Sequence, residues 1–272
     1  MRIQERDRRM VRDVFLHRVV RRDDLIGLGH FNSVPRCNQR LSQLVSAKWL
    51  RRIDRVNGLL VGQGVYAPGP AATGFLMEEL DVAMEEAKKQ SRSPEGPLLI
   101  EHALRVLDFR QQLTSEVQRA GLDSVEWLCE PECLHEFQSK RSNVGTWTKT
   151  LVKPDAYFLL ETPSHRLDCF LEADLGHVAL PRFAEKLRTY DRYVESGAFR
   201  DAYRAEGFCV LTVTVGERRL SNLAALPTKR CRHLLTTWAR LERAGILRDS
   251  WTGAGGSRVS LLGAASRKEP DR

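Results

Sequence analysis

Two apolar runs flank a short polar turn in the second half of the sequence, and an acidic residue borders each run. The runs cover residues 157–160 and 169–171, and Thr-Pro-Ser-His separates them. Runs of this length bounded by turn residues predict two neighbouring strands of a hairpin. Such a hairpin would bring Asp155 close to Glu172. Two adjacent carboxylates repel each other unless a cation lies between them, so this segment is the candidate catalytic or metal site.

The elements around this hairpin predict an α+β or α/β fold, a mixed sheet flanked by helices. An acidic amphipathic helix at 71–90 either packs on the preceding module or mediates self-association. Apolar periodicity predicts helices at 98–120, 180–194, 217–226 and 238–244. Short apolar runs predict strands at 124–128 and 233–237, and a fully buried strand at 208–215.

The positive charge is concentrated at the start of the chain. The formal net charge is +8, and residues 1–67 alone contain 14 Lys or Arg and 6 Asp or Glu. The remaining residues hold 29 of each sign. A small module that carries all of the excess charge is typical of a domain that binds a polyanion.

The first 68 residues have the element order of a winged helix-turn-helix. Apolar spacing predicts helices at 5–18, 22–28 and from Ser33 to about Ala47, with Pro35 in the first turn of the third. Asn-Gly at 57–58 lies between two apolar-rich runs and predicts a β-hairpin, followed by a further strand at 64–67. In that architecture the third helix enters the major groove of double-stranded DNA.

Polar residues on the predicted third helix and wing are the candidate DNA-binding residues. Arg, Asn and Gln side chains can form paired hydrogen bonds with base edges, and arginines on a wing contact phosphates. On the helix these residues are Arg36, Asn38, Gln39, Arg40 and Gln43, and on the wing they are Arg51, Arg52 and Arg55. The alternative is a protein-interaction module with solvated arginines.

The most evident linker is Ser-Arg-Ser-Pro-Glu-Gly-Pro at 91–97, where we place the domain boundary. The sequence therefore predicts a DNA-binding domain at 1–68, a connecting helix and linker at 69–97, a second domain at 98–262 and a disordered tail at 263–272. We expect a cytoplasmic protein, because no apolar run is long enough to span a bilayer and the N-terminus is too charged for a secretory signal.

The acidic segment resembles the PD-(D/E)xK nuclease superfamily. Pro154-Asp155 looks like the first half of its signature, and Glu172 occupies the second. The lysine expected two residues after Glu172 is replaced by Asp174, and Lys186 on the following helix is placed to substitute for it. The resemblance implies that Asp155, Glu172 and Asp174 hold Mg²⁺ or Mn²⁺. Glu101 would supply an outer carboxylate.

Several motifs in order along residues 8–225 also resemble the replication-relaxation family. They follow the predicted winged helix and lie at 102–110, 125–128, 153–158 and 171–176. The family comprises bacterial proteins linked to plasmid replication and mobilisation. The resemblance therefore implies DNA transactions on a mobile element.

Three functional hypotheses remain open from the sequence. The first is a metal-dependent DNA endonuclease or nickase that the winged helix targets to DNA. The second is a non-catalytic DNA-binding factor that retains an inactive nuclease-like domain and assembles replication, relaxase or transposition proteins. The third is a transcriptional regulator that forms a homodimer through its C-terminal domain. None of the three requires a membrane.

Overall fold

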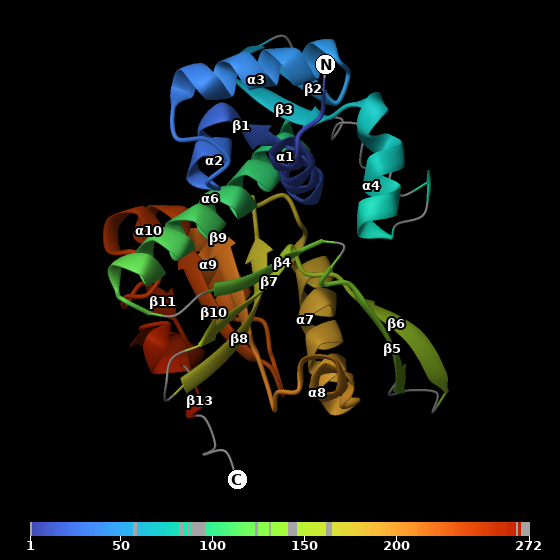
Figure 1. Ribbon diagram of the computed structural model, residues 1–272. Helices are drawn as coiled ribbons and strands as arrows, with labels where there is room; N and C mark the ends of the chain where they lie inside the picture. The colour runs from blue at the N-terminus through green and yellow to red at the C-terminus, as the bar shows by residue number, and fades with distance from the viewer. Residues whose placement is uncertain are drawn as a thin grey trace. The chain divides into compact units, whose positions relative to one another are not determined.

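The computed structural model describes residues 2–56, 59–81, 84–85, 88, 96–122, 125–130, 132–140, 146–161, 165–264 and 266–267. It divides into an N-terminal unit, residues 1–111, and a C-terminal unit, residues 112–272. Each unit combines helices with a β-sheet (Figure 1), which confirms the predicted mixed α/β class. In the described part of the chain, no helix is long and apolar enough to cross a membrane.

Three helices of the N-terminal unit form where the apolar spacing predicts them. They are α1 (Glu5–Leu16), α2 (Arg22–Gly27) and α3 (Val34–Ser46). Met10 and Val14 of α1 are fully buried because residues four apart share one face of a helix. Ser33 is the N-cap residue of α3, and Pro35 lies in its first turn, where a missing backbone N–H costs nothing.

The sheet of the N-terminal unit is antiparallel, with strand order β1-β3-β2. Its strands are β1 (Val20–Arg21), β2 (Leu50–Val56) and β3 (Leu59–Pro68). Val56 pairs with Leu59 across the predicted Asn-Gly turn, which itself lies outside the described residues. The run that follows the Asn-Gly turn and the further strand expected at 64–67 are one continuous strand. Strand β1 was not predicted, because two residues are too few to show an alternating pattern.

The helix predicted at 71–90 is interrupted at Asp81, with described helical residues at 73–80 and again at 84–85 and 88. A 3-10 turn, η1 (Pro70–Ala72), leads into α4 (Thr73–Leu80). Asp81 then adopts a left-handed conformation with φ 50° and ψ 38°, which ends the helix. Most of the predicted linker lies outside the described residues.

The long helix α6 (Pro97–Arg119) confirms the prediction for 98–120. Its first half belongs to the N-terminal unit, where Ile100 and Ala103 pack against Val19, Val65 and Ala67. The boundary between the two compact units lies within this helix, between Gln111 and Gln112.

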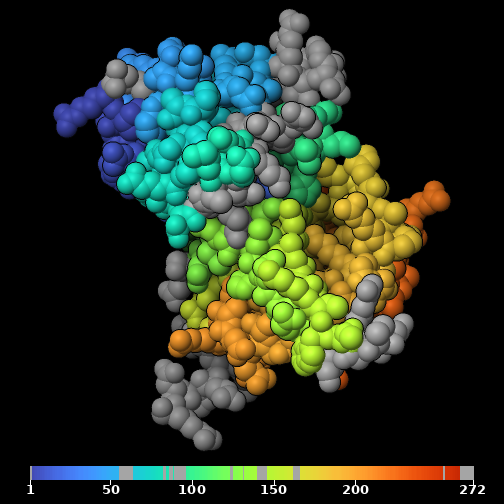
Figure 2. Space-filling model, turned by 90° about the vertical axis from the view of Figure 1, so that its right-hand side faces the viewer, coloured from blue at the N-terminus to red at the C-terminus, as the bar shows by residue number. Residues whose placement is uncertain are grey.

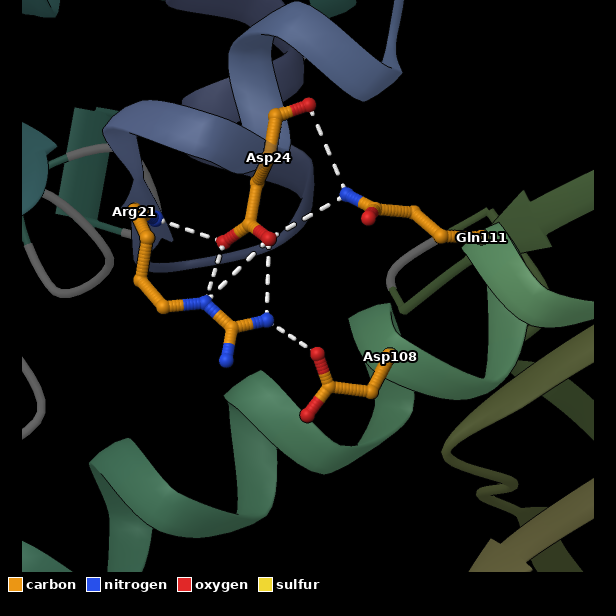
Figure 3. Close-up of polar contacts among 4 residues, drawn as sticks. All are labelled: Arg21, Asp24, Asp108 and Gln111. Carbon is orange, nitrogen blue, oxygen red and sulfur yellow. Dashed lines mark hydrogen bonds and ion pairs between the residues drawn. The ribbon is translucent and has the colours of Figure 1, made fainter. Parts of the chain in front are cut away.

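A polar network also attaches α6 to α2 within the N-terminal unit (Figure 3). The buried carboxylate of Asp24 accepts hydrogen bonds from the backbone N–H of Arg21 at 2.6 Å and from its guanidinium at 2.9 to 3.2 Å. Gln111 of α6 donates to the same carboxylate at 3.2 Å, and Asp108 of α6 pairs with Arg21. These contacts fix the start of α2 to one face of α6.

The main sheet of the C-terminal unit has strand order β12-β11-β10-β9-β8-β7-β4. The first three along the chain, β4 (Val125–Cys129), β7 (Ala156–Glu161) and β8 (His165–Ala173), are antiparallel neighbours. Strands β9 (Cys209–Thr214) and β10 (Arg232–Thr237) continue parallel to β8. The short antiparallel strands β11 (Trp251–Thr252) and β12 (Arg258–Val259) complete the edge. The predicted hairpin is thus formed by β7 and β8, and both strands lie inside the sheet, between β4 and β9.

Helices follow strands β8, β9 and β10 along the chain and build the core. They are α7 (Leu180–Glu195), α8 (Ala198–Tyr203), α9 (Glu217–Ala224) and α10 (Trp238–Ala244). Phe183, Leu187 and Tyr190 of α7 lie in one buried cluster with Phe170 of β8 and Val210 of β9. This packing fixes the position of α7 against the central strands.

Several short elements were not predicted from the sequence. Strands β5 (His135–Lys140) and β6 (Trp147–Val152) form a separate two-stranded ribbon. The tail predicted to be disordered from Gly263 contains the 3-10 turn η3 (Leu262–Ala264) and the strand β13 (Ser266–Arg267), which pairs with β8. In this pairing Ser266 lies opposite Arg166, and Arg267 lies opposite His165, at the start of β8. A further 3-10 turn is η2 (Ala254–Gly256).

Candidate functional site

The predicted pairing of the two acidic residues is present in the C-terminal unit. Asp155 precedes β7, and its backbone N–H donates to Leu171 of β8 at 3.0 Å. Its carboxylate Oδ2 accepts a hydrogen bond from the backbone N–H of Ala173 at 2.7 Å. The hairpin therefore holds the half-buried Asp155 beside the end of β8, where Glu172 lies.

Both carboxylate oxygens of Glu172 are engaged by α7. The Tyr190 hydroxyl donates to Oε1 at 2.5 Å, and the Lys186 ammonium pairs with Oε2. Lys186 and Tyr190 lie one helical turn apart, so one face of α7 supplies both groups. The Glu172 side chain is 4% exposed, whereas that of Lys186 is 34% exposed. Lys186 therefore links a buried carboxylate to the solvent.

Burial and neighbouring charges shift the pKa values of this pair. Burial raises the pKa of Glu172 to about 7; the Asp155 carboxylate adds to the rise, and Lys186 and Tyr190 oppose it. Burial disfavours the charge of Lys186, but the carboxylates of Glu172 and Asp155 outweigh that effect and raise its pKa. A buried carboxylate beside a retained cation is the kind of arrangement that functional sites use.

Asp174, the third predicted metal ligand, is held by different partners. Arg219 of α9 binds its carboxylate with two hydrogen bonds of 2.9 and 3.1 Å, and the Thr214 hydroxyl donates at 2.6 Å. The side chain is fully buried. These contacts give Asp174 a structural role at the end of β8. Arg219 is one basic residue on a polar helix, and its sequence context carries no signal for such a partner.

The capacity of this site for a metal rests on Asp155 and Glu172. Carboxylate oxygens are the donors that Mg²⁺ and Mn²⁺ prefer, so these two residues fit a hard divalent cation by their chemistry. In the described part of the chain, no group of three or more His, Cys, Asp or Glu residues is arranged to hold a metal. A cation here would compete with Lys186 for Glu172. Glu101, the predicted outer carboxylate, is exposed on α6 in the N-terminal unit.

The polar residues predicted to contact DNA divide into two groups on α3. Arg36, Asn38, Gln39 and Gln43 are exposed. Arg40 instead pairs with the buried Asp7 of α1 and donates to Gln43 at 2.6 Å. The Arg40 pair gives the pKa of Asp7 a net decrease, although burial alone would raise it. Arg40 therefore joins α1 to α3, and the exposed face of α3 is left to the other four residues.

A groove of about 420 Å³ lies between α3 and the strands β2 and β3. Its polar lining comes from Arg22, Asn38, Ser42, Ser46, Arg52 and Tyr66. Arg52 forms a 2.6 Å ion pair with Asp54, and both side chains are more than half exposed. Arg51 is also exposed on β2, whereas the side chain of Arg55 lies outside the described residues. Arg22 and Arg52 thus line the groove beside the polar face of α3.

Comparison with known proteins relates most of the chain to one family. The family model described as replication-relaxation matches residues 15–207, more than two thirds of the chain. No curated protein and no solved structure matches.

Proposed function

This chain belongs to the replication-relaxation family, and on that premise we propose that it binds double-stranded DNA in the replication or mobilisation of a plasmid or other mobile element. The observation that carries this proposal is the exposed polar face of α3. Arg36, Asn38, Gln39 and Gln43 present side chains that can hydrogen-bond base edges. The concentration of positive charge in residues 1–67 supports a polyanionic partner.

The geometry of the N-terminal unit supports docking as a winged helix-turn-helix. Helix α3 would enter the major groove, and the ribbon of β2 and β3 would act as the wing along the backbone. Arg51 on β2 is exposed and would contact a phosphate, and Arg52, also exposed, would exchange its ion pair with Asp54 for a phosphate. In this docking, Arg40 remains paired with Asp7 inside the unit. It orients α3 and does not contact bases.

Duplex binding by the full chain tests this docking. Arg36→Ala should weaken binding by about 1–3 kcal/mol if Arg36 contacts a base edge. Arg218→Ala, an exposed arginine on α9 in the C-terminal unit, is the matched control and should leave affinity unchanged. Fluorescence anisotropy across a salt series measures both affinity and salt slope. Equal affinity and equal salt slope for Arg36→Ala and the unaltered chain would rule the docking out.

We propose metal-dependent DNA nicking or cleavage as a second function, which the convergence of Asp155, Glu172 and Lys186 favours. The neighbouring strands β4, β7, β8 and β9 support a PD-(D/E)xK-like unit. Helix α7, which follows β8 and precedes β9 along the chain, also supports it. Asp155 and Glu172 would hold Mg²⁺ or Mn²⁺, which supplies an activated water and neutralises phosphate charge. Lys186, partly exposed, would place a positive charge beside the phosphate.

Supercoiled plasmid with Mg²⁺ or Mn²⁺ tests the second function. We expect nicking by the unaltered chain, loss with Asp155→Ala, and full retention with Glu185→Ala, an exposed neighbour of Lys186 on α7. Absence of nicking with either metal, or equal nicking by Asp155→Ala, would favour a non-catalytic factor. Such a factor would assemble replication, relaxase or transposition proteins, or act as a homodimeric regulator. Metal-independent binding to palindromic sites would identify the regulator.

A further inference from the structure

Glu130 follows β4 and lies next to Asp155, the first carboxylate of the acidic site. In the pairing of β4 with β7, Cys129 lies opposite Ala156. Glu130 comes directly after Cys129, and Asp155 comes directly before Ala156. The same register, continued by one residue, therefore sets Glu130 opposite Asp155. Residues opposite each other in an antiparallel pair share one face of the sheet, so a second carboxylate lies beside Asp155.

The face that these two residues share is the one that α7 covers. Side chains alternate along a strand, so Glu130 shares the face of Leu128, and Asp155 shares that of Tyr157. Tyr157 belongs to the buried cluster that includes α7, and Leu128 packs against this cluster. Glu172 lies on the same face, because α7 binds its carboxylate. Three neighbouring strands thus bring three carboxylates to one face of the sheet.

The charges of these carboxylates act on one cation. Burial disfavours the charge of Lys186, but three carboxylates outweigh that effect and raise its pKa. In decreasing order of effect they belong to Glu172, Asp155 and Glu130. Burial also raises the pKa of the Cys133 thiol, and the carboxylates of Glu130 and Asp155 add to the rise. The Glu130 charge therefore reaches the groups around Asp155 and favours a cation among them.

The ion-pair partner of Glu130 is a lysine at the surface. Lys153 pairs with Glu130 at 2.7 Å, and its side chain is 54% exposed, whereas that of Glu130 is 17% exposed. Figure 2 shows the yellow-green part of the chain, which includes β5 and β6, at the surface beside the gold residues of α7. An ion pair with a largely exposed lysine contributes little free energy. Glu130 can therefore exchange Lys153 for another cation at little cost.

We propose that Glu130 is a positioning residue of the acidic site, and that it holds water molecules of a divalent cation bound by Asp155 and Glu172. Mg²⁺ keeps several waters when one or two carboxylates bind it. Among the described residues, no three acidic, His or Cys side chains are arranged to bind one metal directly, so Glu130 would act through such waters. Glu130 thus supplies the outer carboxylate that was predicted at Glu101. This inference rests on the second proposed function and deepens it.

Mn²⁺ binding to the full chain without DNA, followed by electron paramagnetic resonance, tests the inference. Glu130→Gln should weaken Mn²⁺ binding by about 10- to 100-fold, the usual effect of losing a group that orients a metal's surroundings. Lys153→Met should instead strengthen it by about 2- to 5-fold, because it removes the cation that pairs with Glu130. Lys149→Met, which breaks the exposed pair with Glu136 on the ribbon, is the matched control and should leave the affinity unchanged.

Opposite effects from the two halves of one ion pair separate a positioning role from a structural one. If the pair only braced the end of β4, both substitutions would lower stability and neither would strengthen Mn²⁺ binding. Thermal unfolding of each variant measures that stability. Changes of Mn²⁺ affinity in the same direction for Glu130→Gln and Lys153→Met would therefore overturn the inference.

Plasmid nicking separates this inference from the proposed function. The expected order of Mn²⁺ affinities without any nicking would remove the second function and leave the role of Glu130 supported. Equal Mn²⁺ affinity for Glu130→Gln and the unaltered chain would overturn that role even if nicking occurs. Absence of Mn²⁺ binding by the unaltered chain would overturn it as well.

Discussion

Lys186 on α7 forms an ion pair with Glu172 on β8, fourteen residues earlier in the chain. The pair places a cation where the sequence signature lacks one, since the position two residues after Glu172 is Asp174. Tyr190, one turn further along α7, binds the other oxygen of the same carboxylate. A single helix face thus supplies the positive charge and the hydrogen bond that a buried carboxylate requires.

Removal of the Lys186 charge should destabilise the C-terminal unit. Lys186→Met leaves Glu172 buried without its cation, so we expect a loss of about 1–3 kcal/mol in the free energy of unfolding. Glu172→Gln in the Lys186→Met background should recover part of that loss, because no buried charge remains. Urea denaturation of the two single variants and the double variant measures the coupling. Additive effects in this cycle would show that the pair contributes nothing to stability.

Two arginines on α3 should respond differently to substitution. Arg40→Ala leaves the carboxylate of Asp7 fully buried without its ion pair and should cost about 2–4 kcal/mol in unfolding free energy. Arg36→Ala removes an exposed side chain and should change stability by less than about 0.5 kcal/mol. Chemical denaturation checks both values. A stable Arg40→Ala variant with weakened duplex binding would instead mean that Arg40 contacts DNA directly.

Of the residues drawn in Figure 3, Asp24 should contribute most to the free energy of unfolding. Asp24→Ala removes a buried acceptor that serves Arg21 and Gln111, and should cost about 2–4 kcal/mol in unfolding free energy. The Asp108 side chain is 38% exposed, so Asp108→Ala should cost about 1 kcal/mol or less. Equal destabilisation by the two substitutions, measured by urea denaturation, would contradict this ranking.

Acid should destabilise the N-terminal unit through His17. Burial, and then the charge of Arg110, lowers the pKa of His17 to about 3, whereas the unfolded chain keeps a value near 6.5. The unfolded state therefore binds the extra proton in this window, and the stability present above pH 6.5 decreases as the pH falls. From pH 7 to 4.5 this one group should cost about 2–3 kcal/mol.

His17→Gln tests that assignment, because glutamine can accept a hydrogen bond from Arg110 but does not titrate. Urea denaturation at pH 7 and pH 4.5 should show a smaller loss of stability for the variant than for the unaltered chain. An identical loss in both would place the acid sensitivity in other groups.

The missed and reassigned residues have identifiable physical causes. Strands β5 and β6 are rich in Thr, Ser, Lys and Gln, so their alternation lacks the apolar contrast that predicts a strand. Asp174 could be assigned only when Arg219 of α9, 45 residues later, was seen to bind it. Arg36 and Arg40 are both arginines of the predicted third helix, and the sequence does not distinguish their roles. Only the packing of α1 against α3 shows that Arg40 pairs with Asp7 while Arg36 is exposed.

The sequence by itself determined the family, the mixed α/β class, the main helices, the hairpin of the runs at 157–160 and 169–171, and the separation of charge along the chain. These features depend on local spacing and composition, which can be read from residues that are close together in the sequence. Only the tertiary structure decided that Lys186 faces Glu172, that Asp174 is bound by Arg219, and that Glu130 lies beside Asp155. Those outcomes depend on which distant elements pack together, because burial and charge pairing are properties of the folded neighbourhood and not of a residue's position in the chain.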